Sequence, residues 1–155
     1  MGKLSFNEKL AILKKTDVFE QFPDMVLKSI VDVLEEIHVN EGNTFIYKGE
    51  EGKCMYILCS GKLRVHDEDA KIAEVEPISV IGEMAILTTE PRMASVTALQ
   101  DSKLLRINQT EFEVLAEDNV DFYKSIVKML ISKLQKQNME LAEFARNARR
   151  IASLF

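Results

Sequence analysis

The middle of the sequence, from residue 37 to about residue 108, is a succession of short β-type runs separated by turn residues. Glycine, asparagine and aspartate separate the runs, and Gly42, Gly49, Gly52 and Gly61 mark the early turns. Several short strands at this spacing predict a barrel or a jelly roll. The predicted strands are 36–40, 44–48, 53–60, 62–66, 71–75, 78–81, 95–99 and 103–107.

Helical patterns flank this β-rich segment on both sides. Residues 5–36 read as helices with a bend, and Pro23 followed by Asp24 predicts the start of the second one. After residue 107, Thr110 and Glu113 form the pattern of a capping box, which predicts a short helix beginning there. The fold class predicted is therefore α+β: an antiparallel, jelly-roll-like β-roll flanked by N-terminal helices and a long C-terminal helix.

The predicted C-terminal helix, residues 121–155, contains no proline and no glycine. Apolar residues recur along it at spacings of three and four, which is typical of a coiled-coil seam with one polar break at Gln137. A helix packed on its own β-roll and a two-chain coiled coil both fit this pattern, and both can hold together. The residues of this seam are Val127, Leu130, Leu134, Gln137, Leu141, Phe144, Ala148, Ile151 and Phe155.

The stretch 80–96 combines features that suit a sugar phosphate. An apolar strand breaks at Gly82, where the backbone can bend or approach a ligand closely. Glu83 begins a short helical piece whose free N–H groups and positive dipole end suit an anion. Arg92 carries a planar, permanent charge that pairs well with phosphate. With Glu83 as an acceptor for a hydroxyl group, the stretch fits a sugar phosphate.

Two blocks of this stretch resemble the phosphate-binding cassette of cyclic nucleotide-binding domains. They are GEMAIL at residues 82–87 and PRMASV at residues 91–96, in the family's order and at its separation. The glycine-rich stretch 41–52 and the run 55–65 also resemble the early strands and the central hairpin of this family. The family includes the bacterial catabolite activator protein and the regulatory subunits of cyclic-AMP-dependent protein kinase.

The resemblance implies separate roles for the cassette residues. Arg92 would bind the exocyclic phosphate oxygen, and Glu83 would accept a hydrogen bond from the ribose 2′-hydroxyl. The backbone N–H groups of Ala85 and Ala94 would complete the anion site. Plainer interpretations stay open, in which Arg92 pairs with Glu90 or Glu83 at the surface and Glu83 stabilises a helix N-terminus. The ligand-binding residues implied for the cassette are Gly82, Glu83, Met84, Ala85, Arg92, Met93 and Ala94.

Two further features bear on the base of the nucleotide. Where the family usually has Ala, Ser or Thr after the arginine, this chain has Met93, which offers no hydroxyl to the phosphate or to guanine. We therefore expect cAMP rather than cGMP, with an unusual ligand or none as the other possibility. In the family the long C-terminal helix covers the base, and by distance Gln137 and Asn138 fall where adenine is contacted. Alternatively, Gln137 is a polar break that sets the register of the seam, and Asn138 is an exposed helix residue.

The interpretation we favour is a regulatory cyclic nucleotide-binding domain spanning residues 1–155. The sequence shows no paired acid and base carboxylates, no nucleophile with an oriented base and no metal-ligand spacing, so we expect neither an enzyme nor a metal or other cofactor. Ligand binding would shift a conformational equilibrium, and the C-terminal helix would carry the change onward. The alternative is a degenerate β-roll that dimerises or docks and binds no nucleotide, or binds another small anion.

Composition limits the partners and the compartment. The formal net charge of −5 argues against nucleic acid, and no apolar run approaches the ~18 residues that span a bilayer. Cys54 and Cys59 lie on opposite faces of one predicted strand and should not pair, which suits a reducing compartment. We therefore expect a cytoplasmic location. The expected partners are a small cyclic nucleotide, a second copy through the C-terminal helix, and a fused or separate effector domain.

Overall fold

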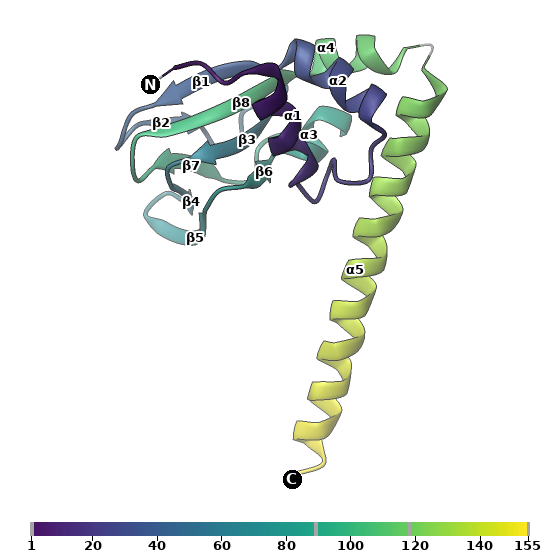
Figure 1. Cartoon of the computed structure of the whole chain (residues 1–155). Helices are drawn as coiled ribbons and strands as arrows, with labels where there is room; N and C mark the ends of the chain where they lie inside the picture. Colours follow the sequence, from purple (N-terminus) through teal and green to yellow (C-terminus); the bar gives the residue numbers. More distant parts are fainter. Residues whose placement is uncertain (1, 89, 118, 155) are drawn as a thin grey trace.

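The computed structural model describes residues 2–88, 90–117 and 119–154. Figure 1 shows a body built from strands, helices gathered at one side of it, and one long helix that extends away. The α+β fold class predicted from the sequence is confirmed. None of the helices in the described ranges has the length and hydropathy needed to cross a membrane. The helices are α1 (Phe6–Lys14), α2 (Asp24–Val33), α3 (Glu83–Thr88), α4 (Gln109–Ala116) and α5 (Val120–Ala152).

Two four-stranded antiparallel sheets form the β-roll. One sheet has the order β1-β8-β3-β6 and the other has the order β2-β7-β4-β5, so both combine strands from distant parts of the chain. We call them sheet A and sheet B. The strands are β1 (Glu35–Val39), β2 (Thr44–Ile46), β3 (Cys54–Ser60), β4 (Leu63–Asp67), β5 (Ala70–Val75), β6 (Ser79–Ile81), β7 (Ser95–Ala98) and β8 (Ser102–Asn108).

Two apolar cores lie on opposite sides of sheet A. The helix-side core joins α1, α2, α4 and α5 to one face of the sheet, and Val80 of β6 packs against it. The roll core fills the space between the two sheets, and Ile81, the next residue of β6, packs there instead. Cys54 and Cys59 divide in the same way between the roll core and the helix-side core. Both thiols are free, as the odd spacing predicted.

The starts of α2 and α4 test how well the local sequence pattern predicts where a helix begins. α2 begins at Asp24 after Pro23, as predicted, and buries Val26, Leu27, Ile30 and Val31. The predicted cap at Thr110 is wrong. β8 continues without a loop into α4, which begins at Gln109, and Asn108 takes the N-cap position without a side-chain hydrogen bond. Because the N–H of Gln109 donates to the Lys53 carbonyl at 2.8 Å, the chain turns into the helix before it reaches Thr110.

The long helix α5 is docked over its first third only. Phe122, Ser125, Ile126 and Met129 are buried against the body. From residue 134 onward every described side chain is exposed, and Figure 1 shows this part running away from the sheets. Of the predicted seam, Leu130 is half-buried against the helix-side core, whereas Leu134, Leu141, Phe144 and Ile151 face solvent. The last seam residue, Phe155, is outside the described residues.

Candidate functional site

The described residues of the stretch 80–96, which leave out residue 89, fold as the sequence predicted. β6 ends at Ile81, Gly82 has φ of 79°, and α3 begins at the next residue. A positive φ of this size suits glycine, because a side chain in this region clashes with the following carbonyl. The chain then returns past Pro91, which bridges to Glu51, and enters β7. Met84 and Ala85 contribute backbone to the first turn of α3, and their side chains lie outside the described part of the structure.

The backbone of Arg92 is fixed from both sides by the loop that follows β2. Its N–H donates to the Glu50 carbonyl at 2.6 Å, and its own carbonyl accepts from Gly49 N–H at 2.8 Å. The half-buried guanidinium donates from Nη2 to the carbonyl of Cys54 at 2.5 Å. It also lies directly against Gly82, where an added Cβ would collide with Nη1. The position of the guanidinium therefore depends on rigid backbone and on the absence of a side chain at Gly82.

An aromatic wall, which the sequence analysis did not identify, lies beside this arginine. Tyr56 of β3 is buried in the roll core, and its ring packs edge-on against Phe45 with centroids 5.3 Å apart. Burial raises the pKa of the Tyr56 hydroxyl, and the charges of Arg106 and Arg92 oppose the rise. The alternation of side chains along a strand could have indicated that Tyr56 faces inward. The guanidinium of Arg92 is bonded to Cys54 at the border of this apolar core, where a charge pairs more strongly than in water.

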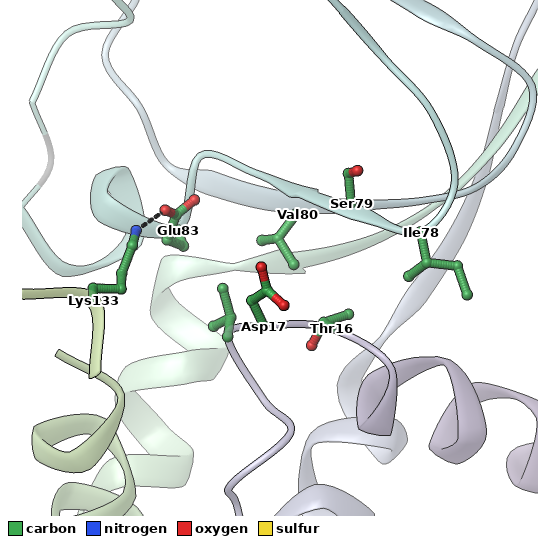
Figure 2. Close-up of a pocket in the computed structure, with 8 residues that line it drawn as sticks. Thr16, Asp17, Ile78, Ser79, Val80, Glu83 and Lys133 are labelled. Carbon is green, nitrogen blue, oxygen red and sulfur yellow. Dashed lines mark hydrogen bonds and ion pairs between the residues drawn. The ribbon is translucent and has the colours of Figure 1, made fainter. Parts of the chain in front are cut away.

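The side chain of Glu83 points toward α5. Its carboxylate forms an ion pair with Nζ of Lys133 from α5, as Figure 2 shows. The side chains of Glu83 and Lys133 are 21% and 36% exposed. Among the described residues no ion pair joins Arg92 to Glu83 or to Glu90, so the plainer pairings considered for Arg92 are not seen. Lys133 was not identified from the sequence, since it lies 50 positions from Glu83.

The remaining predicted ligand-binding residues differ in their exposure to solvent. Ala94 is half-buried beside Arg92 in sequence, whereas the side chain of Met93 is 88% exposed. Gln137 and Asn138 are exposed on α5, about one helical turn beyond Lys133 toward its free end. The structure does not bring these two amides to the cassette. Within the described residues, no group of three or more His, Cys, Asp or Glu side chains could hold a metal ion.

The chain is 30% identical over 118 residues to a cAMP-dependent protein kinase regulatory subunit of Dictyostelium discoideum. The match covers 71% of this chain and 34% of that protein, so the chain spans about a third of this relative's length.

Two solved structures share the fold. The N-terminal domain of a transcriptional regulator from Streptomyces coelicolor A3(2) superposes with a TM-score of 0.75 at 23% identity, over 84% of this chain and 94% of that one. The regulatory domain of Toxoplasma gondii PKA with cAMP gives 0.67 at 24% identity, over 74% and 46%. The family model described as "Cyclic nucleotide-binding domain" matches residues 36–119, more than half of the chain. The chain therefore belongs to the cyclic nucleotide-binding domain family, as its two cassette blocks predicted.

Proposed function

We propose that this chain is a regulatory module that binds cAMP in preference to cGMP and transmits binding through α5. The observation that carries the proposal is the guanidinium of Arg92, held half-buried against Gly82 inside the cassette of a family that binds cyclic nucleotides. Preorganised donors of this kind suit a phosphodiester because they need no rearrangement when the anion arrives. The chain itself carries no catalytic role in this proposal.

Each cassette residue has one role in the proposed complex. Arg92 binds the exocyclic phosphate oxygen, and the backbone N–H groups of Ala85 and Ala94 supply further donors. Glu83 accepts a hydrogen bond from the ribose 2′-hydroxyl. Met93 points into solvent and offers no hydroxyl, so nothing at this position favours the amino group of guanine. Preference for cAMP rests on that missing hydroxyl and on the relative from Dictyostelium, whose name describes it as cAMP-dependent.

Transmission follows from the contact between Glu83 and Lys133. The carboxylate that would accept the 2′-hydroxyl is already paired with an ammonium of α5. Ligand binding therefore exchanges partners on Glu83 and weakens one link that holds α5 to the body. A second link is apolar, since Met129 of α5 lines a small cavity together with Ile86 and Leu87 of α3. A change in α3 on binding would reach α5 through both links, which shifts the population of α5 positions.

Coverage of the base requires α5 to move. Gln137 and Asn138 lie in the free part of the helix, so contact with adenine needs this part to swing toward the cassette or to come from a second copy. The amide of either residue can donate to and accept from the adenine edge. We propose these contacts as features of the bound state only.

We also propose a homodimer through α5, acting on an effector in the cytoplasm. The described side chains of α5 from residue 134 onward are exposed, with Lys136 paired to Asp17 at 3.6 Å, and most of the stability of a helix comes from packing of an apolar face. A second copy would cover the exposed seam residues Leu134, Leu141 and Phe144. Native mass measurement across concentrations tests this: Leu141→Glu should give a monomer, while Met139→Glu, outside the seam, should leave the dimer intact. The free thiols suit the reducing cytoplasm.

Calorimetric titration tests the central proposal. We expect heat on adding cAMP and less or none on adding cGMP. Arg92→Ala should weaken cAMP binding by about 10- to 100-fold, because a hydrogen bond to a charged group is worth about 1.5–3 kcal/mol. Arg64→Ala is the matched control, since Arg64 also donates to a carbonyl, that of Asp69, but lies on β4 outside the cassette.

The second candidate function is a docking domain without a nucleotide ligand. Its supporting observation is that Glu83 is already neutralised by Lys133 while the seam of α5 lies exposed. Absence of heat and of any melting shift with either nucleotide at millimolar concentration would favour this candidate, whereas a dimer that forms without ligand is expected under both.

A further inference from the structure

A second cavity lies on the helix side of sheet A and shares Glu83 with the cassette (Figure 2). Its volume is about 280 Å³, near the lower end of small-molecule sites. Three separate parts of the chain form it: the link between α1 and α2, the strand β6 with Glu83, and the helix α5. Arg92, the proposed phosphate ligand, does not line this outer cavity, because its guanidinium is bonded to the Cys54 carbonyl instead. The residues lining it are Thr16, Asp17, Val18, Ile78, Ser79, Val80, Glu83 and Lys133.

The floor of the outer cavity is apolar. Val18 is buried, and Ile78 and Val80 are half-buried, all three in or against the helix-side core. A body of a few methylene groups would therefore lose water on entering without leaving a polar group unpaired below it.

The hydroxyl groups of the outer cavity are already used. Thr16 Oγ1 donates to the Leu13 carbonyl at 2.8 Å and accepts from Phe19 N–H at 3.0 Å. Ser79 Oγ donates to the Glu76 carbonyl at 2.7 Å. Their O–H donors are thus occupied, whereas Ser79 Oγ and the carboxylates of Asp17 and Glu83 can still accept, so the chemistry of the lining calls for a donor.

The charges of the outer cavity agree with this. Its lining has two carboxylates and one ammonium, that of Lys133, which is itself seated on Glu83. The adjoining hollow of about 230 Å³ adds one more carboxylate, Glu20, and one more ammonium, Lys136, so the excess of one negative charge is kept. The carboxylate of Asp17 is 83% exposed, and its described partner is Lys136 at 3.6 Å. Lys133 thus marks where an ammonium group fits.

We propose that the outer cavity binds a small primary ammonium compound with a short apolar body. The ammonium lies between Asp17 and Glu83 and takes the place of Lys133, and the apolar body rests on Val18, Ile78 and Val80. Since Lys133 then loses its partner, occupancy of the outer cavity also removes one link between α5 and the cassette. The site shares Glu83 with the proposed nucleotide site but does not use Arg92, so it can be tested without nucleotide.

The test is an NMR titration of backbone amides without any cyclic nucleotide, using three probes of one size: n-butylammonium, butan-1-ol and butyrate. We expect saturable shifts at residues 16–18 and 78–80 with n-butylammonium at concentrations up to tens of millimolar, and no saturation with the other two. Equal binding of butan-1-ol would overturn the role of the charge. Absence of saturable shifts with n-butylammonium would overturn the site.

Three variants sharpen the titration. Asp17→Asn should weaken n-butylammonium binding by about two- to threefold, the size expected for one exposed charge pair. Lys133→Met should strengthen it by a similar factor, because the probe no longer competes with the built-in ammonium. Asp32→Asn, an exposed carboxylate on α2 away from the cavity, should change nothing. Weaker binding in Lys133→Met, or equal losses in Asp17→Asn and Asp32→Asn, would contradict the proposed geometry.

Discussion

The two charged residues of the cassette are held in different ways. Arg92 is fixed by backbone, through the carbonyls of Glu50 and Cys54 and the close approach of Gly82. Glu83 is held by one side chain, Lys133, which belongs to a helix that is docked over only part of its length. The side proposed for the phosphate is therefore preformed, whereas the side proposed for the ribose hydroxyl depends on where α5 lies. Such a division allows a ligand to be recognised at one residue and to act through the other.

The largest expected effect concerns the docking of α5. Phe122 is fully buried, and its ring contacts Phe112 and Phe22 with centroids 5.0 and 6.2 Å away. Phe122→Ala should lower the free energy of unfolding by about 3–5 kcal/mol in urea titrations. Phe144→Ala, at an exposed position on the same helix, should change it by less than about 0.5 kcal/mol at concentrations where the chain is monomeric.

The same variant tests the division between the two residues. In folded Phe122→Ala, amide hydrogen exchange should become faster along α5 near Lys133, while the amide of Arg92, bonded to Glu50, stays protected. Equal loss of protection at both places would mean that Arg92 also depends on α5, and the comparison would fail.

The next effect concerns Gly82, on which the Arg92 side depends. Gly82→Ala should lower stability by about 1–2 kcal/mol because of its positive φ. It should also weaken cAMP binding by about tenfold or more, equivalent to 1.4 kcal/mol, because the new Cβ displaces the guanidinium. Gly42→Ala is a close control: its φ of 88° imposes similar strain, but nothing lies within 4 Å of the added Cβ. If both variants bind cAMP as the unmodified chain does, Arg92 does not need Gly82.

The third effect concerns Lys133, the ion-pair partner that holds the carboxylate of Glu83. Lys133→Met should tighten cAMP binding by about two- to fivefold, since a partly exposed ion pair no longer competes for the carboxylate. The gain should be absent for 2′-deoxy-cAMP, which lacks the hydroxyl that Glu83 would bind. Lys136→Met, which removes an exposed pair with Asp17 instead, should have no effect on either ligand. An equal gain for both ligands would show that Lys133 acts through something other than Glu83.

The sequence predicted the parts of this site that depend on neighbouring residues. Gly82, the start of α3 and the return to β7 could be predicted because turn chemistry and side-chain alternation act over a few positions. The partner of Glu83 could not, because Lys133 reaches it only through the angle at which α5 packs on the body. Thr110 shows the same limit on a smaller scale: its local pattern was right for a cap, but a backbone hydrogen bond from Gln109 to Lys53 began the helix earlier.

The smallest effect should come from an edge of the roll that neither Arg92 nor Glu83 contacts. Glu74 lies on the edge strand β5, and its carboxylate is 3.1 Å from Nζ of Lys71 and 3.2 Å from Nζ of Lys62. Hydrogen bonds from Lys71 and then from Lys62 lower the pKa of Glu74 below its ordinary value of 4.5. The stability from these pairs is therefore fully present above about pH 4.5 and is lost as the pH falls through the lowered pKa.

When the pH is lowered below about 4.5, the melting temperature of Glu74→Gln should therefore fall slightly less than that of the unmodified chain. The difference should be small, since the side chain is 37% exposed and water screens both pairs. Glu76→Gln, whose carboxylate is 3.9 Å from the same Lys62, should follow the unmodified chain. The affinity for cAMP should be equal in all three proteins, because a change at this edge reaches the cassette only if the roll transmits strain. A loss of affinity in Glu74→Gln would mean that the preformed side of the site extends to β5 and that Arg92 is held by more than its own loop.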